Sequence, residues 1–204
     1  MSTHLPYFHT ADRVQMLLNQ LHLWSGTRWR HAGARPNEMR CGVSGDCLFW
    51  VHVFKAIGAL PTRLEIPNYR RKEALADEMQ TLRGCIEATN CTDLVFDEAQ
   101  TKQLPVFRVG DVLLFRNGTS GAHCGLVVRE APVHFTHLTG NGLLEEPLRQ
   151  AHYLAALAFV YRLLEAPQNQ VSETHEANPK TEFRNSIDFR ISRFVLRVSP
   201  RRES

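Results

Sequence analysis

The stretch that most constrains the fold is GVSGDCLFWVHVFKAIG, residues 42–58. From about Asp46 to Ala59 its apolar side chains occupy almost every side of a helix: Leu48, Phe49, Val51, Val53, Phe54 and Ile57. A helix that is apolar on most sides must be buried on most sides. Gly58 and Pro61 end it. We therefore predict a central helix covered by other elements.

The apolar and polar patterns on either side of this segment predict which elements cover the helix. Residues 11–24 carry apolar side chains at helical spacing and predict an amphipathic helix. Residues 66–104 are mostly polar, with a helical pattern. In residues 112–128 the runs VLLF and HCGLVV flank a Gly/Asn/Ser turn, which predicts a β-hairpin. Residues 133–148 predict two further strands, and residues 153–164 a strand in their C-terminal half. The predicted class is α+β, with N-terminal helices packed on an antiparallel sheet.

The 204 residues suit one domain with an appendage. We expect the domain to occupy residues 1–164. Residues 165–182 have few large apolar side chains and predict a flexible linker. Residues 183–204 form a basic extension with alternating apolar and polar residues. Two interpretations of this extension remain open: strand addition to a sheet, or a solvated tail.

Charge and targeting patterns exclude some classes of protein. The net charge of +3 is too small to predict nucleic acid as a partner. No apolar run approaches the roughly 18–20 residues that cross a bilayer, so no membrane partner is expected. The opening MSTHLPYFHTADRV lacks the pattern of a secretory signal, which predicts cytoplasmic synthesis and export only by another route. Five cysteines in a domain of this size predict reduced thiols.

One cysteine lies where a nucleophile would be activated. Cys47 occupies the first turn of the predicted central helix, behind Asp46 as a plausible N-cap. Backbone N–H groups and the helix dipole stabilise a thiolate there, and the same N–H groups can bind an oxyanion. The alternative is a packed core cysteine.

A thiolate needs a base, and His123 opens the predicted strand after the NGTSGAH turn. On the next strand, His134 and His137 are three residues apart and therefore on opposite faces. Either could orient the imidazole of His123, and His134 fits an exposed strand residue better. The alternative for His123 is a surface turn histidine.

Five segments resemble one family, in the family's order: GTRWRHAG, GDCLFWVHVFKAIG, FRVGDVLLFR, GAHCGLVV and FTHLTGNGLLEEPL. They resemble NlpC-type cell-wall cysteine peptidases, a papain-like group, and look closest to the branch carried by phages and gene-transfer particles. The resemblance covers about residues 11–164 and implies the papain-like NlpC-type fold. It departs from the family at Leu48 and Phe49, where relatives have smaller residues, and at Trp29, where they have a tyrosine.

Carried over residue by residue, the resemblance makes Cys47 the nucleophile, His123 the base and His137 the orienting third member. We place Trp29, His31 and Asp46 beside the substrate, which the resemblance implies is a peptidoglycan stem peptide. Phage tail proteins are the further partners, and the virion or cell wall the site of action.

The resulting hypothesis is a cysteine hydrolase of amide bonds, without metal or cofactor. The alternative is a structural or tail-assembly protein that keeps the scaffold without turnover, favoured by the unusual Leu48 and Phe49. Acyl transfer by the same pair is a third hypothesis. Zinc is a further alternative, because Cys41 and Cys47 share the spacing of Cys85 and Cys91. That spacing is wider than the usual zinc knuckle.

Overall fold

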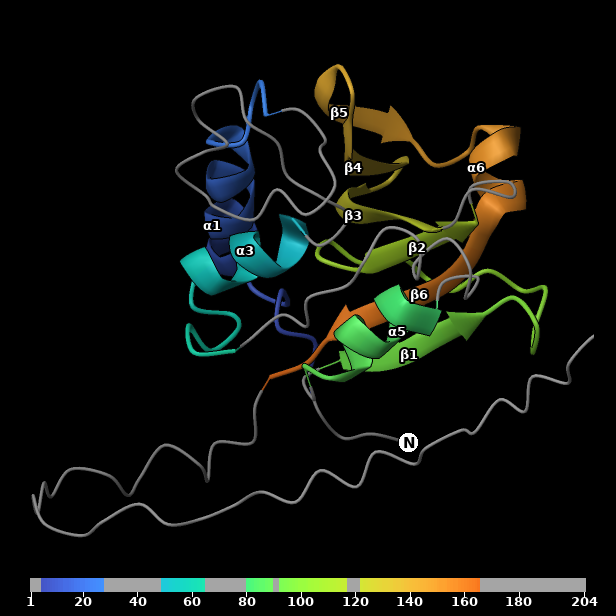
Figure 1. Ribbon diagram of the computed structural model, residues 1–204, viewed down its shortest axis with the longest axis horizontal. Coiled ribbons are helices and arrows are strands. Elements are labelled where there is room, and N and C mark those ends of the chain that lie inside the picture. The colour runs from blue at the N-terminus through green and yellow to red at the C-terminus, as the bar shows by residue number, and fades with distance from the viewer. Residues whose placement is uncertain (1–4, 28–48, 65–79, 90–91, 117–121, 166–204) are drawn as a thin grey trace, which may run out of the picture. The chain divides into compact units, whose positions relative to one another are not determined.

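The computed structural model describes residues 5–27, 49–64, 80–89, 92–116 and 122–165 (Figure 1). In chain order the described elements are α1 (Ala11–His22), α3 (Phe49–Ala56), α5 (Gln80–Glu87), β1 (Thr92–Asp97), β2 (Val112–Arg116), β3 (Ala122–Glu130), β4 (Val133–Thr139), β5 (Gly142–Pro147), α6 (Ala151–Ala156) and β6 (Leu157–Leu163). Among these helices, none is long and apolar enough to span a membrane.

The six described strands form one antiparallel sheet in the order β1-β6-β2-β3-β4-β5. Strands β2 to β5 follow one another as a meander, so each pairs with its neighbour in the sequence. The last strand, β6, lies between β1 and β2. Among the described strands, β1 and β5 are therefore the edges.

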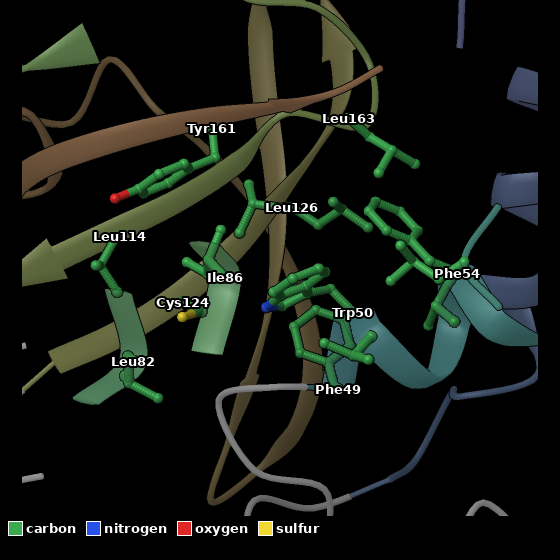
Figure 2. Close-up of a cluster of buried hydrophobic side chains, with 14 of the residues drawn as sticks. Phe49, Trp50, Phe54, Leu82, Ile86, Leu114, Cys124, Leu126, Tyr161 and Leu163 are labelled. Carbon is green, nitrogen blue, oxygen red and sulfur yellow. The ribbon is translucent and has the colours of Figure 1, made fainter. Parts of the chain in front are cut away.

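Both faces of the sheet are covered, because successive side chains of a strand point to opposite faces. On one face, residues of α1, α3 and α5 pack against Val112, Leu114, Cys124 and Leu126 (Figure 2). On the other face, Leu113, Phe115, Val127 and Phe135 pack with Tyr153 of α6. We call these the α3 face and the α6 face. The predicted α+β class, helices on an antiparallel sheet, is confirmed.

Helix α3 is buried as predicted. Phe49, Trp50 and Phe54 are fully buried, and the rings of Trp50 and Phe54 meet edge to face with centroids 5.5 Å apart. Gly58 ends the segment with a φ of 74°, a conformation that favours glycine. The described helix begins at Phe49, and the predicted start at Asp46 lies outside the described residues.

Most other predicted elements are confirmed. Helix α1 is capped by the side chain of Thr10, which accepts from the N–H of Arg13. The β2–β3 hairpin, the β4–β5 pair and the strand at Leu157–Leu163 are present. The helical prediction for residues 66–104 was wrong at Thr92–Asp97, which form β1. Pairing with β6, with Thr92 opposite Leu163, outweighs the local polar pattern.

The two ends of the domain are joined. The N–H of Tyr7 donates to the carbonyl of Leu163 at 2.9 Å, and the N–H of Glu165 donates to the carbonyl of Leu5 at 2.9 Å. Arg13 also forms an ion pair with the carboxylate of Glu165. The compact unit that contains the described residues runs from Met1 to Gln168. Of the predicted linker 165–182, only Glu165 is described, and these contacts attach it to the domain. The rest of the linker and the extension 183–204 lie outside the described residues.

Candidate active site

Two of the predicted site residues meet across neighbouring strands. His123 is the second residue of β3, and His137 lies on β4, which pairs with β3. His123 Nε2 lies 2.7 Å from His137 Nδ1, which is hydrogen-bonding distance. The rings stand edge to face, with centroids 5.0 Å apart and planes at 76°. The predicted pairing of His123 with a histidine of the next strand is therefore present, and the histidine is His137.

A glycine makes room for this arrangement. Gly125 lies two residues after His123 and therefore on the same face of β3. A Cβ built there would lie 2.5 Å from Cδ2 of Phe135, so the ring of Phe135 occupies the space of the missing side chain. Phe135 in turn packs against His137, with ring centroids 5.1 Å apart. The absence of a side chain at Gly125 thus lets an aromatic ring support His137.

The hydrogen-bond chain continues beyond His137. Its Nε2 lies 2.9 Å from Oε2 of Glu146 on β5. The same oxygen accepts a hydrogen bond from the hydroxyl of Tyr153, which comes from α6. The chain from His123 through His137 and Glu146 to Tyr153 crosses three consecutive strands and ends on a helix. We call it the histidine–glutamate chain.

Burial and charge set the protonation of both rings. Burial lowers the pKa of His123 to about 4, and the neighbouring His137 acts in the same direction. Burial also lowers the pKa of His137, against the opposing effect of its hydrogen bond with Glu146. Both imidazoles are therefore neutral at pH 7. A neutral imidazole has one nitrogen that donates and one that accepts, so His123 can act as a base.

The remaining predicted histidine lies on the other face of β4. His134 Nδ1 lies 3.0 Å from Oε1 of Glu145, which also pairs with Arg129 at 3.0 Å. His134 and His137 therefore point to opposite faces, and His134 is separated from His123. The other predicted site residues, Trp29, His31, Asp46 and Cys47, lie outside the described residues.

Sequence reasoning missed Glu146 and Tyr153. Glu146 pairs with Phe135 in the β4–β5 register, which places its side chain on the same face as that of His137. The Gly-Asn-Gly turn and strand alternation could have indicated this, once the register of the hairpin was known. For Tyr153, the sequence carries no such signal, since its position depends on how α6 folds back over the sheet.

Metal binding is a separate question for these side chains. The ranges that the structure describes hold no group of three or more His, Cys, Asp or Glu side chains that could bind a metal ion. Of the cysteines in the zinc alternative, Cys41, Cys47 and Cys91 lie outside those ranges. What the described site contains is an organic acid–base chain: two neutral imidazoles, a carboxylate and a phenol.

The class defined by fold and site is an α+β domain with a histidine pair on adjacent antiparallel strands. No family model matches the chain. No curated protein matches it either. Among solved structures, it is similar to the crystal structure of a "similar to lipoprotein, NLP/P60 family" protein from Staphylococcus aureus subsp. aureus Mu50. The identity is 15%, the TM-score is 0.49, and the match covers 81% of this chain and 46% of that one. The chain thus spans about half the length of that protein.

Proposed function

We propose that the protein is a cysteine hydrolase that cleaves amide bonds in peptidoglycan stem peptides, with Cys47 as nucleophile, His123 as base and His137 as the residue that orients the base. One observation carries the proposal: His123 Nε2 lies 2.7 Å from His137 Nδ1, while His123 Nδ1 has no hydrogen-bond partner among the described residues. A base held at one nitrogen and open at the other is the arrangement that nucleophilic catalysis requires.

The path of the chain sets a requirement for Cys47 as the partner of this base. Phe49, two residues after Cys47, is buried in the cluster on the α3 face of the sheet. Cys124, the residue after His123, belongs to the same cluster. His123 alternates with Cys124 along β3 and therefore points to the α6 face, opposite α3. Because His123 is the second residue of β3, the proposed thiol would reach its ring around the end of that strand.

The chemistry follows from these roles. His123 Nδ1 removes the proton of the Cys47 thiol, and the sulfur attacks the amide carbon to form a C–S bond. The C–N bond then breaks, and the imidazolium of His123 returns the proton to the leaving amine. Water, deprotonated by the same nitrogen, hydrolyses the thioester and restores the thiol. Backbone N–H groups at the start of the helix would stabilise the oxyanion in both steps.

A second candidate is a structural protein of a phage tail that keeps this scaffold without turnover. The bulk of Phe49, close to the nucleophile in sequence, is the feature that favours it. That ring is fully buried and packs against Trp24 with centroids 5.7 Å apart, so its volume fills the core. The histidine–glutamate chain favours the enzyme, since a structural protein has no need of two neutral imidazoles, one buried and one partly buried, in hydrogen-bonding contact.

Digestion of purified peptidoglycan tests the proposal. We expect the wild type to release peptide fragments, identified by mass spectrometry, and Cys47→Ala to release none. Cys91→Ala serves as the matched control, because it removes a thiol to which no role is given. Equal product patterns for the wild type and Cys47→Ala would show that the hydrolase proposal is wrong for this substrate.

Thiol reactivity distinguishes the two candidates without a substrate. At pH 6, an activated thiolate at Cys47 should be alkylated far faster than Cys85 or Cys91. His123→Ala should remove this difference. If all thiols react at similar rates in the folded wild type, the result favours the structural protein over the enzyme. The delivery route proposed with the enzyme, a phage tail or lysis system, rests on the sequence resemblance alone.

A further inference from the structure

We propose that Glu146 is a positioning residue for the site: its carboxylate, held by Tyr153, fixes which nitrogen of His137 and which nitrogen of His123 carries a proton, so that His123 presents an unprotonated Nδ1. The catalytic consequence rests on the proposed function. The assignment of protons does not, because it follows from the contacts of the histidine–glutamate chain alone.

The first step is the carboxylate. An ionised carboxylate only accepts hydrogen bonds. Oε2 of Glu146 lies 2.9 Å from Nε2 of His137, so this nitrogen must carry the proton and donate it. The hydroxyl of Tyr153 donates to the same oxygen, which holds the carboxylate in place from the side of α6.

The second step extends this assignment of protons from His137 to His123. Neutral His137 with its proton on Nε2 has a lone pair on Nδ1. That nitrogen lies 2.7 Å from Nε2 of His123, which must therefore donate. Neutral His123 with its proton on Nε2 then has its lone pair on Nδ1. One carboxylate on β5 thus determines the direction of every hydrogen bond up to the base.

The third step concerns charge. When His123 Nδ1 accepts a proton, the ring becomes a cation and keeps its Nε2–H hydrogen bond with His137. No other proton has to move. The negative charge of Glu146 stabilises this cation through the polarised imidazole of His137, in a partly buried site where charges interact more strongly than in water. Glu146 therefore offsets part of the cost of charging the partly buried imidazole of His123.

Substitution of Glu146 by glutamine tests the inference with little change of shape. A glutamine side chain can donate as well as accept, so it permits the reversed set of protons, in which His123 carries its proton on Nδ1. Nitrogen-15 NMR of histidine side chains distinguishes the two tautomers. We expect His123 and His137 to be Nε2-protonated in the wild type at pH 7, and a second tautomer to appear for both in Glu146→Gln.

The rate of peptidoglycan cleavage should decrease when the second tautomer appears. We expect kcat to decrease about 10- to 100-fold in Glu146→Gln with KM little changed, the range typical of a residue that orients another ligand or base. Glu145→Gln is the matched control, since Glu145 is adjacent in sequence, lies on the other face and contacts His134 and Arg129. It should change neither the tautomers nor kcat.

A second variant provides a test if Glu146→Gln fails to fold. Tyr153→Phe removes the hydroxyl that holds Glu146 but keeps the carboxylate, so both histidines should stay Nε2-protonated while kcat decreases less than in Glu146→Gln. If Glu146→Gln shows the wild-type tautomers and the wild-type kcat, the inference is wrong. If the wild type cleaves no peptidoglycan but the tautomers change as expected, the proposed function fails and the proton assignment stands.

Discussion

At the scale of single residues, the site depends on one position that has no side chain. Gly125 is what allows the ring of Phe135 to lie beside His137, because any Cβ would overlap that ring. Phe135 cannot easily move away, since it is fully buried and packs against Phe115 and Tyr153 with centroids 5.1 and 4.8 Å apart. Packing of the α6 face and the geometry of the histidine pair are therefore coupled.

Substitution of Gly125 by alanine should lower the free energy of unfolding by about 1–3 kcal/mol, the usual cost of forcing extra volume into a packed core. Urea denaturation monitored by circular dichroism measures this. Gly84→Ala is the control: a Cβ at Gly84 meets nothing within 4 Å, and alanine is the better helix former. An equal loss in both variants would contradict the packing argument.

The pKa of His123 predicts a pH dependence of stability. Because its folded pKa is about 4, below the unfolded value of 6.5, the unfolded chain binds the proton first as the pH falls. The stabilising contribution is thus complete above about pH 6.5 and is lost as the pH falls towards 4. Burial is incomplete, so we expect a loss of about 1–3 kcal/mol. Between pH 7 and pH 4, the free energy of unfolding should decrease less in His123→Gln than in the wild type. An equal decrease in both proteins would argue against a ring that burial keeps neutral.

At the scale of elements, the meander β2–β5 was the most predictable part of the fold. The turns before β3 and β5 contain Gly and Asn between short apolar segments, so these hairpins and the faces of their side chains follow from local rules. That His134 and His137 point to opposite faces could be predicted for this reason, whereas local rules left open which of them contacts His123, and the family resemblance indicated His137. The strand Thr92–Asp97 could not be predicted, because its partner Leu157–Leu163 is distant in sequence and only the folded sheet brings them together.

An ion pair between a partly buried arginine of β6 and a buried aspartate just before β2 stabilises the pairing of these two strands. Arg162 of β6 donates from Nε and an η nitrogen to the two oxygens of Asp111, each at 2.8 Å. Burial raises the pKa of Asp111, although Arg162 and the N–H of Arg108 both favour its charged form. The carboxylate therefore depends on its partner, since an unpaired buried charge is strongly destabilising.

Removal of the Arg162 guanidinium should lower the stability of the fold. We expect Arg162→Leu to lower the free energy of unfolding by about 3 kcal/mol. Arg129→Leu, which breaks an exposed pair with Glu145, should cost less than about 1 kcal/mol. Thermal denaturation of the two variants compares them directly. Adding Asp111→Asn to Arg162→Leu should restore part of the loss, and no recovery would mean that lost packing of the arginine stem dominates.

At the scale of the whole molecule, the domain is a sheet with both faces covered and its ends joined. The N-terminal segment and the end of β6 hydrogen-bond through Tyr7, Leu163 and Glu165. All described elements lie within Met1–Gln168. The scarcity of large apolar residues in the stretch 165–182 predicts an end of the domain at its start, since a core needs such side chains, and truncation tests that prediction.

Removal of residues 169–204 should leave the thermal midpoint unchanged to within about 2 °C, because every described contact of the core lies before residue 169. Differential scanning calorimetry of the full chain and of the chain ending at Gln168 tests this. A chain ending at Arg162 is the matched comparison. It lacks Leu163 and Glu165, which both bond to the N-terminal segment, and should melt at a lower temperature. A lower midpoint already in the chain ending at Gln168 would contradict the assigned domain end.

The order of the strands has a consequence for how the site assembles. The histidine–glutamate chain is built entirely from residues 123–153, where each strand pairs with the next, so its contacts need only short loops to close. Cys47 precedes this segment by a long stretch of chain, and α3 reaches the sheet only through long-range packing. His123, His137 and Glu146 therefore form a local unit. Under the proposed function, a substitution that disrupts the core beneath α3 would displace the proposed thiol of Cys47 while the proposed base stays in place.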